Sequence, residues 1–533
     1  MASPSVSPPP RTPPRTSRSA ALVASGILCS RLAGLIRLRV FAYFFGLRSD
    51  AADAYMAASR IPNVLQNLFG EGALSGSFIP VYAALLARGD EREATRVAGA
   101  VAAVLALIAA VLVLLGMAAA PLLTMVIAPG FEGAKRDLTI EIVRILFPGA
   151  GLLVMSAWCL GILNSHHRFL LSYTAPVLWN AAMIVTLLVF GPHHTLPRLA
   201  TILAWGAIVG SALQFGVQVP AVLRLAPHLR LVWDTVDEQV RTVIRNFVPV
   251  FVSRGVVQIS AYVDALLASL LPTGVVTGLA NAQILYTLPV SLFGMSVSAA
   301  ELPTMSGAAG LADTEAIRRR LDGGLRQIAF FVVPSVVGFM ALGDVIAAAL
   351  LQTGRFTHAD AVYVWAILGG ASIGLLASTL GRLYSSTYYA LRDTRTPLRY
   401  AIVRVTLTTV LGYLAAIVLP PAIGMPSRWG AVGLTATAGM AAWVEYLLLR
   451  RTLNHRLGRT GLPISYAAKL WGAAAAGAAV AWSIKLLIPF SQPIAVAAVT
   501  LVPYGLVFLG GTMLLRVPES HTALRRVTSR LGF

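Results

Sequence analysis

The chain has 533 residues, of which 57% are hydrophobic and 12% charged, and its mean hydropathy is +0.75. Soluble proteins carry about 25% charged residues, so this composition excludes a soluble domain, and the apolar content excludes a disordered chain. The net charge of +20 would suggest a nucleic-acid partner in a soluble protein, but in a membrane protein it has a topological explanation, and we expect no nucleic-acid partner.

The first element in chain order is a tail, residues 1–19, which is rich in Pro, Ser and Arg and is predicted to be disordered. Apolar runs long enough to cross the roughly 30 Å hydrocarbon layer of a bilayer follow it, and the first is too long for the core of a signal peptide. The sequence predicts an all-α polytopic membrane protein with fourteen transmembrane helices. These spans lie at about residues 20–45, 53–86, 97–126, 138–164, 170–191, 197–223, 243–271, 275–306, 324–352, 359–390, 397–420, 430–449, 464–488 and 493–515.

Basic residues are distributed unevenly among the connections between these spans. Short cytoplasmic loops retain Lys and Arg, and most arginines outside the spans fall in alternate connections, beginning with the N-terminal tail. The opposite connections hold few basic residues, namely Arg48, Lys135, Arg136, Arg198, Arg355 and Arg428. Fourteen spans with both termini in the cytoplasm fit this asymmetry, so most of the positive charge reflects topology.

Motifs of the first half recur in the second half at a nearly constant offset, which indicates an internal repeat. Arg31 recurs as Arg254, an offset of 223, and Gly70 recurs as Gly294, an offset of 224. Six spans separate the copies, and because six is an even number both copies have the same orientation in the membrane. They are therefore expected to be related by a pseudo-two-fold axis along the membrane normal. In such folds the substrate site lies between the two lobes, which rock to give alternating access. The predicted segments are a cytoplasmic tail (1–19), an N-lobe of six helices (20–223), a cytoplasmic linker (224–242), a C-lobe of six helices (243–449), a cytoplasmic loop (450–463), two appended helices (464–515) and a cytoplasmic tail (516–533).

Ionisable residues inside spans are costly in a bilayer and are functional candidates. In the second span, Asp53, Asn67 and Glu71 lie within about 20° of Arg60 around an ideal helix, so this polar stripe must line a cavity or meet the arginines of the first span. Guanidinium groups suit phosphate oxygens, which favours a cationic cavity that binds an anionic head group; structural ion pairs between the first two spans are the alternative. The predicted substrate-binding residues are Arg31, Arg37, Arg60, Arg254, Asn63 and Asn67, and the predicted gating or coupling residues are Asp53, Glu71, Asp264 and Glu301.

No metal or cofactor site is predicted. The histidines occur in loops, as in His166-His167, without a third ligand at metal spacing. The sequence contains no phosphate-binding Gly-Lys-Ser/Thr loop, nucleophile elbow or paired-Cys motif. Energy for transport is therefore expected from an ion gradient, the membrane potential or downhill substrate flow.

Several motifs resemble those of the MurJ/MviN family of lipid II flippases in the MOP exporter superfamily. The motifs are SRLAGLIR (30–37), RIPNVL (60–65), FGEGALSGSFIP (69–80), APGF (128–131), LNSHHRF (163–169), LPVSLFGM (288–295), TGRF (353–356) and YALRDTRTP (389–397). The resemblance covers most of residues 24–450. It implies a bacterial inner-membrane protein that moves the undecaprenyl-pyrophosphate-linked peptidoglycan precursor lipid II from the cytoplasmic to the periplasmic leaflet. The implied partners are lipid II, membrane lipids and cell-wall synthesis proteins.

By the same resemblance, Arg31, Arg37, Asp53, Arg60 and Glu71 are required for transport. The chain departs from the family pattern at two positions where relatives carry arginine, which here are Gln66 and Ile284, the latter within Gln283-Ile284. Arg254 is a candidate replacement for the charge lost in the eighth span. Asp264 matches a sodium ligand of some relatives, but the eleventh span offers Thr408 and Gly412, which argues against sodium coupling.

Three other functions can be weighed against this expectation. Another MOP transporter could carry a different polyprenyl-linked oligosaccharide or a cationic drug, although a cationic drug would favour carboxylates over the arginines Arg31, Arg37 and Arg254. A membrane enzyme acting on lipid-linked sugars would need catalytic carboxylates or histidines in sizeable outer loops, and these loops are short. A scaffold for the cell-wall machinery would not explain the charged stripe. We therefore predict a transporter and not an enzyme.

Overall fold

The computed structural model describes residues 15–234, 237–489 and 491–520; inside the helices, the side chains of residues 15–25, 27, 71–72 and 248–261 are outside the described part. The described residues are almost entirely helical and form no β-strand. This confirms the predicted all-α fold class. Most of the two predicted tails lies outside the described residues.

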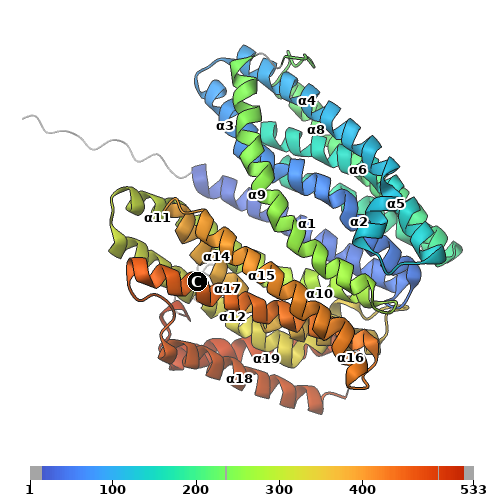
Figure 1. Ribbon diagram of the computed structural model, residues 1–533, viewed down its shortest axis with the longest axis vertical. Helices are drawn as coiled ribbons and strands as arrows, with labels where there is room; N and C mark the ends of the chain where they lie inside the picture. The colour runs from blue at the N-terminus through green and yellow to red at the C-terminus, as the bar shows by residue number, and fades with distance from the viewer. Residues whose placement is uncertain (1–14, 235–236, 490, 521–533) are drawn as a thin grey trace, which may run out of the picture. The chain divides into compact units, whose positions relative to one another are not determined.

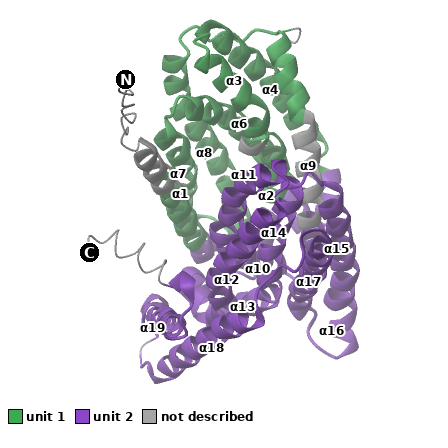
Figure 2. Cartoon of the chain, turned by 90° about the vertical axis from the view of Figure 1, so that its left-hand side faces the viewer, with its two compact units in different colours: residues 1–40, 58–121, 140–258 green, residues 41–57, 122–139, 259–533 purple. Residues whose placement is uncertain are grey.

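The helices group into two compact units, each assembled from separate stretches of the sequence (Figures 1 and 2). Unit 1 comprises residues 1–40, 58–121 and 140–258, and unit 2 comprises residues 41–57, 122–139 and 259–533. Two short stretches of the first half of the chain therefore belong to unit 2. The predicted lobe boundaries stay a prediction.

Unit 1 is built mainly from α1 (Arg15–Phe45), α2 (Asp50–Phe69), α3 (Glu71–Ala87), α4 (Glu91–Ala118), α6 (Gly133–Ser165), α7 (Phe169–Phe190), α8 (Leu196–Leu225) and the first part of α9 (Glu238–Ser269). Unit 2 holds most of α5 (Ala120–Ile127), the rest of α9, and α10 (Val275–Pro289), α11 (Ser296–Gly310), α12 (Thr314–Leu351), α13 (His358–Ser372), α14 (Leu375–Ala390), α15 (Arg395–Tyr413), α16 (Leu419–Ala422), α17 (Gly430–Leu457), α18 (Ile464–Leu487) and α19 (Pro493–Leu514). Helices α1, α2, α5, α6 and α9 contribute residues to both units.

The described residues contain 11 helical segments that are long and apolar enough to cross a membrane, or 12 if the bent pair α13 and α14 forms one span. All of them coincide with predicted spans. Two predicted spans, at about 20–45 and 243–271, are not among these segments. They correspond to α1 and α9, which have 31 and 32 residues and include side chains outside the described part. A multi-span helical membrane protein is confirmed, and the number fourteen stays a prediction.

Several spans are interrupted rather than straight. The predicted span 53–86 is broken at Gly70, where a Cβ atom would lie 2.1 Å from the carbonyl oxygen of Gln66, so only glycine fits. Glu71 is the first residue of α3, and its side chain lies outside the described part. Helices α13 and α14 meet at a bend of 43°, and a π-helix, Val290–Met295, joins α10 to α11. Such interruptions inside membrane helices commonly accompany binding sites.

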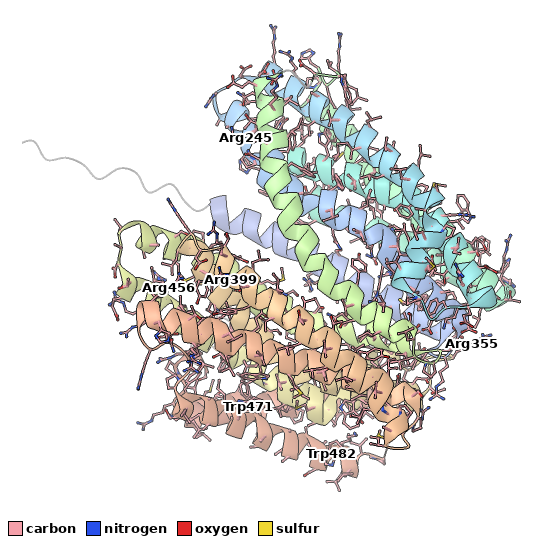
Figure 3. All side chains as sticks on the ribbon, viewed as in Figure 1. Arg245, Arg355, Arg399, Arg456, Trp471 and Trp482 are labelled. Carbon is pink, nitrogen blue, oxygen red and sulfur yellow. The ribbon has the colours of Figure 1, made fainter. Side chains whose placement is uncertain are left out.

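Two ends of the unit 2 helices can be distinguished by their contacts. At one end, which we call the gate end, the backbone N–H of Arg355 donates to the carbonyl oxygen of Tyr43 at 3.0 Å. At the other end, Arg456 pairs with Asp393 at 2.8 Å. Figure 3 shows Arg399 and Arg456 toward one end of these helices and Arg355 toward the opposite end. Connections rich and poor in arginine therefore lie at different ends of unit 2.

The segment that leads into α9 is fastened to α4, and both belong to unit 1. A Cβ atom on Gly99 would lie 2.0 Å from the carbonyl oxygen of Arg230, so the missing side chain lets the linker backbone rest on the helix. Arg96 forms ion pairs with Asp234 and Asp237, and Asp237 accepts hydrogen bonds from the first turn of α9. The described part of the predicted linker is thus an ordered strap.

The two appended helices, α18 and α19, attach to α12 within unit 2. The hydroxyl of Tyr504 donates to the carbonyl oxygen of Pro334 at 2.5 Å, and Lys485 forms an ion pair with Asp344. Tyr504 also packs in a core cluster with Leu342 and small residues of α18. Polar and apolar contacts therefore both fix this helix pair.

Candidate functional site

Arg37 lies on α1 in unit 1, and residues of α7 hold its guanidinium group. Its Nε donates to Asn180 Oδ1 at 2.9 Å, and the guanidinium carbon lies 4.9 Å from the ring centroid of Trp179. Asn180 is oriented in turn, because its amide donates to the carbonyl oxygen of Pro176 at 3.0 Å. These two partners of Arg37 are uncharged, and they orient the guanidinium group through a hydrogen bond and a cation–π contact.

Other predicted substrate residues lie on exposed parts of unit 1. Arg31 is exposed, and it makes no hydrogen bond or ion pair with any residue of the described part. On α2, Arg60 is half-exposed, and Asn63 and Asn67 are exposed. Polar side chains exposed along a membrane-crossing helix face water or a ligand rather than lipid. Part of the polar stripe of α2 is therefore exposed, whereas Asp53, near the start of the same helix, is buried.

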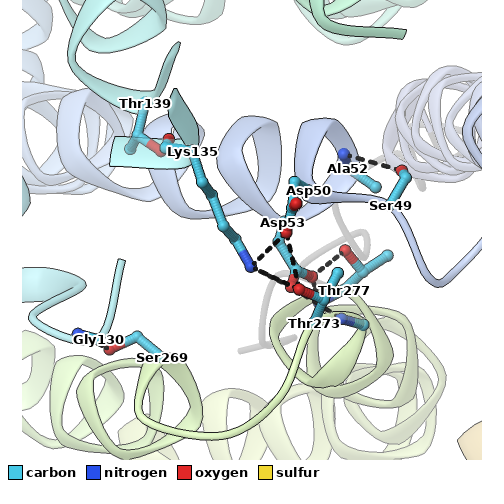
Figure 4. Close-up of polar contacts among 11 residues, drawn as sticks. Ser49, Asp50, Ala52, Asp53, Gly130, Lys135, Thr139, Ser269, Thr273 and Thr277 are labelled. Atoms are coloured by element: carbon cyan, nitrogen blue, oxygen red, sulfur yellow. Dashed lines mark hydrogen bonds and ion pairs between the residues drawn. The ribbon is translucent and has the colours of Figure 1, made fainter. Parts of the chain in front are cut away.

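Asp53 is only 1% exposed and lies at the gate end, within unit 2 (Figure 4). Its Oδ1 accepts hydrogen bonds from the backbone N–H of Thr277 at 2.9 Å and from the Thr277 hydroxyl at 2.6 Å. Its Oδ2 accepts hydrogen bonds from the N–H of Gly274 at 2.8 Å and from Lys135 Nζ at 3.0 Å. The carboxylate thus caps the N-terminus of α10, where the backbone N–H groups and the helix dipole favour a negative charge.

Lys135, at the start of α6, completes this cluster. Its Nζ lies 3.0 Å from Asp53 Oδ2, 3.3 Å from Asp50 Oδ1 and 4.2 Å from the ring centroid of Phe131. The hydroxyl of Thr273 donates to Asp50 Oδ1 at 2.7 Å. The lysine side chain is only 13% exposed, so its interaction with Asp53 is stronger than that of a surface ion pair. We call these residues the gate cluster: Asp50, Asp53, Lys135, Thr273 and Thr277.

A second ion pair lies at the gate end. Arg48, in the connection between α1 and α2, places Nε 3.0 Å from Asp360 Oδ1, in a charge contact that lacks the alignment of a hydrogen bond. Asp360 Oδ2 accepts hydrogen bonds from the N–H and the hydroxyl of Thr357, in a capping box that starts α13. One carboxylate therefore both caps α13 and holds a connection from the first half of the chain.

Helix α14 carries an exposed polar face that was not among the predicted binding residues. All of its residues are buried except Arg382, Ser385, Ser386 and Tyr389. At 100° per residue, these four fall within an arc of about 100° on one side of the helix. Arg382 lies about 12 Å along the helix from its end at Ala390. A charged group at this depth is expected to face water or a ligand.

The surroundings of Arg382 contrast with those of Arg404 on α15. Arg404 Nη1 donates to Glu445 Oε2 at 3.0 Å, so its charge is compensated. Arg382 is within electrostatic reach of this pair and of Tyr286, yet it makes no hydrogen bond or ion pair in the described part of the chain. The hydroxyl of Tyr286 lies 2.6 Å from that of Ser378, one helical turn from Arg382. An exposed guanidinium without a counter-ion is suited to bind an anion.

The remaining predicted residues are dispersed. Asp264 on α9 and Glu301 on α11 are both partly buried. Glu301 Oε2 is buried and accepts no hydrogen bond from any residue that the structure describes. The side chains of Arg254 and Glu71 lie outside the described part, so their roles stay predictions. Among the described residues, no group of three His, Cys, Asp or Glu side chains could hold a metal ion.

Lys135, Arg48 and Arg382 were not among the predicted site residues. A signal existed for the first two, because they lie in connections where the topology predicts few basic residues and their charge therefore needs another explanation. The repeat offset was a second signal. Asp53 and Thr277 are 224 positions apart, and equivalent residues of a two-fold arrangement meet near its axis. Arg382 gave no comparable signal, since the sequence does not distinguish a cavity-facing arginine from one that snorkels to the membrane surface.

Comparison with known proteins places this chain in a family. A family profile described as lipid II flippase MurJ matches residues 41–501. The lipid II flippase MurJ of Burkholderia cenocepacia is 32% identical over 444 residues, which cover 82% of this chain and 84% of the relative. The probable lipid II flippase MurJ of Vibrio cholerae is 28% identical over 449 residues, which cover 83% of each chain.

Solved structures agree with this relationship at the level of the fold. A lipid II flippase MurJ in an inward closed conformation matches with a TM-score of 0.75 and 23% identity, covering 93% of this chain and 99% of that structure. An inward-facing multidrug MATE transporter of the MOP superfamily matches with a TM-score of 0.64 and 18% identity, covering 83% of this chain and 100% of that structure. Because the family profile spans most of the sequence and a curated relative exceeds 30% identity, the chain belongs to the lipid II flippase MurJ family.

Proposed function

We propose that this protein is a flippase that moves lipid II from the cytoplasmic to the periplasmic leaflet of a bacterial inner membrane by alternating access. The observation that carries the proposal is the presence of exposed guanidinium groups on apolar helices, at Arg31 and Arg382, without a counter-ion in the described part. The relatives named above are lipid II flippases, and a lipid-linked diphosphate presents oxygens that guanidinium groups bind through charge-assisted hydrogen bonds.

In this proposal each unit supplies groups that suit the lipid head group. Arg31, Arg37 and Arg60 supply positive charge, and Asn63 and Asn67 supply neutral hydrogen-bonding groups. Arg382 supplies a charge near the position where relatives carry an arginine and this chain has Ile284. The support for this role is the hydrogen bond between Tyr286 and Ser378, which brings the α10 segment containing Ile284 to within about one helical turn of Arg382.

The gate cluster provides the proposed barrier on the periplasmic side. Opening this barrier requires Asp53 to leave both Lys135 and the first turn of α10, so the closed state is held by several interactions that are lost together. A bound diphosphate can shift the equilibrium only by the difference in its affinity for the two states. We therefore propose that the lipid head group binds more tightly when the gate cluster has separated.

The proposed orientation places the gate end in the periplasm and both termini in the cytoplasm. Its support is the scarcity of basic residues in the connections at the gate end, together with the arginine-rich connections at the opposite end of unit 2. The proposed activity is transport without covalent chemistry on the lipid.

Two measurements in a strain depleted of its own lipid II flippase test the proposal. The chain should restore growth, and it should make labelled lipid II accessible to a reagent outside the inner membrane. Arg31→Ala should abolish both effects at normal expression. Arg451→Ala is the matched control, because Arg451 is exposed at the inner end of α17 and makes no polar contact with the described residues. Arg450 is unsuitable as a control, since its Nε donates to the carbonyl oxygen of Thr460 at 3.0 Å.

Failure of the unmodified chain to expose lipid II, or equal rescue by Arg31→Ala and Arg451→Ala, would contradict the proposal. The structural likeness to a multidrug transporter calls for one further control. Vesicles that contain the protein should not transport a fluorescent organic cation, because Arg31 and Arg382 repel such a substrate. Transport of the cation without exposure of lipid II would favour drug export.

A further inference from the structure

Two glycine-containing connections make equivalent contacts at the gate end, within unit 2. Gly130 and Gly354 are 224 positions apart, the offset of the internal repeat. A Cβ atom on Gly130 would lie 2.2 Å from the carbonyl oxygen of Ser269, at the end of α9. A Cβ atom on Gly354 would lie 2.4 Å from the carbonyl oxygen of Tyr43, near the end of α1. Each connection therefore rests on the first helix of the other repeat, at a spacing that excludes any side chain.

Hydrogen bonds and buried aromatic rings accompany both contacts. The N–H of Gly130 donates to the hydroxyl of Ser269 at 3.3 Å, and the N–H of Arg355, next to Gly354, donates to the carbonyl oxygen of Tyr43 at 3.0 Å. The aromatic residues that follow, Phe131 and Phe356, are 3% and 1% exposed. The two contacts thus share a close backbone approach, a hydrogen bond and a buried ring.

The gate cluster lies where the two repeats meet symmetrically. Asp53 bonds to Thr277, 224 positions away, and Asp50 bonds to Thr273, 223 positions away. Equivalent residues of a two-fold arrangement touch each other only near its axis. The gate cluster therefore lies near the pseudo-two-fold axis. The contacts of Gly130 and Gly354 are related to each other by the same axis.

We infer that Gly130 and Gly354 form a pair of equivalent latches that hold the gate end closed, and that a methyl group on either one opens this end. At both positions the overlapping atoms include backbone atoms, which cannot move aside as the tip of a flexible side chain can. Because each contact joins segments from different repeats, the least costly relief is separation of those segments. The inference depends on alternating access and not on lipid II as the substrate.

The test uses Gly130→Ala and Gly354→Ala in the full chain. Gly354 has a φ of +52°, so alanine there also strains the backbone, whereas Gly130 has no such φ and isolates the overlap. Gly133→Ala is the matched control, because Gly133 has a φ of +51° near the same end but nothing within 4 Å of the added carbon. Gly369→Ala is the helical control, since Gly369 also has open space around it.

The readout is labelling by a membrane-impermeant maleimide from the periplasmic side. Cys29 and Cys159 are first replaced by serine, and a reporter cysteine is introduced as Asn281→Cys, at a side chain 2% exposed and one turn beyond Thr277 on α10. We expect both latch variants to label at least about tenfold faster than the parent, because a rarely open state becomes well populated. Gly133→Ala and Gly369→Ala should label at the parent rate.

A disulfide across the gate distinguishes two causes of faster labelling, opening of the gate and local unfolding of α10. Asp50 and Thr273 contact each other across the gate, with Thr273 Oγ1 2.7 Å from Asp50 Oδ1. The pair Asp50→Cys with Thr273→Cys is therefore oxidised before labelling, and mass spectrometry verifies the disulfide, so that the only free thiol is the reporter at position 281. Oxidation of this pair should return labelling of the Gly130→Ala variant to the parent rate. Labelling that stays fast after oxidation, or latch variants that label no faster than Gly133→Ala, would overturn the inference. Neither measurement uses a lipid substrate, so both can be interpreted even if the lipid II tests above fail.

Discussion

Charged side chains of unit 2 are buried and paired at the gate end but exposed and unpaired with any described residue on the open face of α14. Asp53 and Lys135 are buried against each other, and the carboxylate is also hydrogen-bonded to two backbone N–H groups of α10. Arg382 is exposed and has no counter-ion in the described part. Removing one member of a buried pair strands its partner, whereas removing an exposed lone charge leaves the fold intact. Substitutions at the two regions should therefore separate stability from binding.

Asp53→Ala should have the largest effect, because it removes the carboxylate that caps α10 and leaves the largely buried Lys135 with only the exposed Asp50 as a counter-ion. We expect a loss in stability of up to about 3–5 kcal/mol, the cost of a buried charge without a partner, and complete loss of transport. Thermal unfolding in detergent and growth rescue measure the two effects. The double variant Asp53→Ala with Lys135→Ala should lose less stability than the sum of the single changes. Unchanged melting of Asp53→Ala would show that the pair does not hold the gate.

Arg382→Ala should have the opposite profile, with unchanged melting and weaker binding of a lipid diphosphate. Loss of a charge-assisted hydrogen bond of about 1.5–3 kcal/mol corresponds to at least about tenfold in affinity. Binding of undecaprenyl pyrophosphate to the purified protein is the measurement, and uncharged undecaprenol should bind equally to both proteins. Arg382→Lys should recover part of the affinity. Equal affinity of Arg382→Ala and the unmodified protein for the diphosphate would exclude Arg382 from the site.

Asn180→Ala tests an intermediate case, in which an uncharged partner positions a charged residue. Loss of the hydrogen bond from Arg37 Nε should cost about 1 kcal/mol in stability and reduce transport several-fold, because the guanidinium group loses its fixed orientation. Arg37→Ala should abolish transport in the same assay. If Asn180→Ala transported normally while Arg37→Ala did not, the hydrogen bond from Asn180 would not be needed to position Arg37.

The smallest expected effect is a pH dependence at His166, in the connection between α6 and α7. Burial lowers the pKa of this imidazole below its usual value, with His167 and Arg168 adding to the shift, and its Nε2 lies 3.0 Å from the Tyr82 hydroxyl. The unfolded chain then binds a proton more readily than the folded protein, so this contribution is present above about pH 6.5 and is lost as the pH falls through the folded pKa.

The melting temperature of the unmodified protein should therefore fall more between pH 7.5 and 5.5 than that of His166→Gln. The difference should stay below about 2 °C, because the group is only partly buried. His167→Gln is the neighbouring control and should follow the unmodified protein. A steeper pH dependence for His166→Gln than for the unmodified protein would contradict the assigned direction.

The sequence was most informative where one physical cause acts over a long segment. Hydropathy located the spans because about twenty consecutive apolar residues are needed to cross a bilayer. The same averaging concealed the break at Gly70. This break depends on one close backbone contact, in which the Gln66 carbonyl oxygen occupies the space that a side chain at position 70 would need. A window of twenty residues cannot resolve one steric contact.

The candidate site shows the same division. Asp53 was identified from its charge inside a span, but its partners Lys135, Gly274 and Thr277 come from distant connections, and a single sequence does not pair them. The repeat offset could have paired Asp53 with Thr277. Arg404 also lies inside a predicted span, and the structure pairs it with Glu445. For Arg382, only the burial of the rest of α14 reveals the open face.

The contact of Gly99 with the backbone of Arg230 has a mechanical consequence. A connector that hung loosely would absorb the displacement of one helix before the next one felt it. Here the Arg230 carbonyl oxygen lies directly on α4, and Arg96 of the same helix pairs with Asp237, whose carboxylate accepts hydrogen bonds from the first turn of α9. Helix α4 therefore contacts the described part of the connector at two separate points, one before α9 and one at the cap of α9, so a displacement of α4 acts on both.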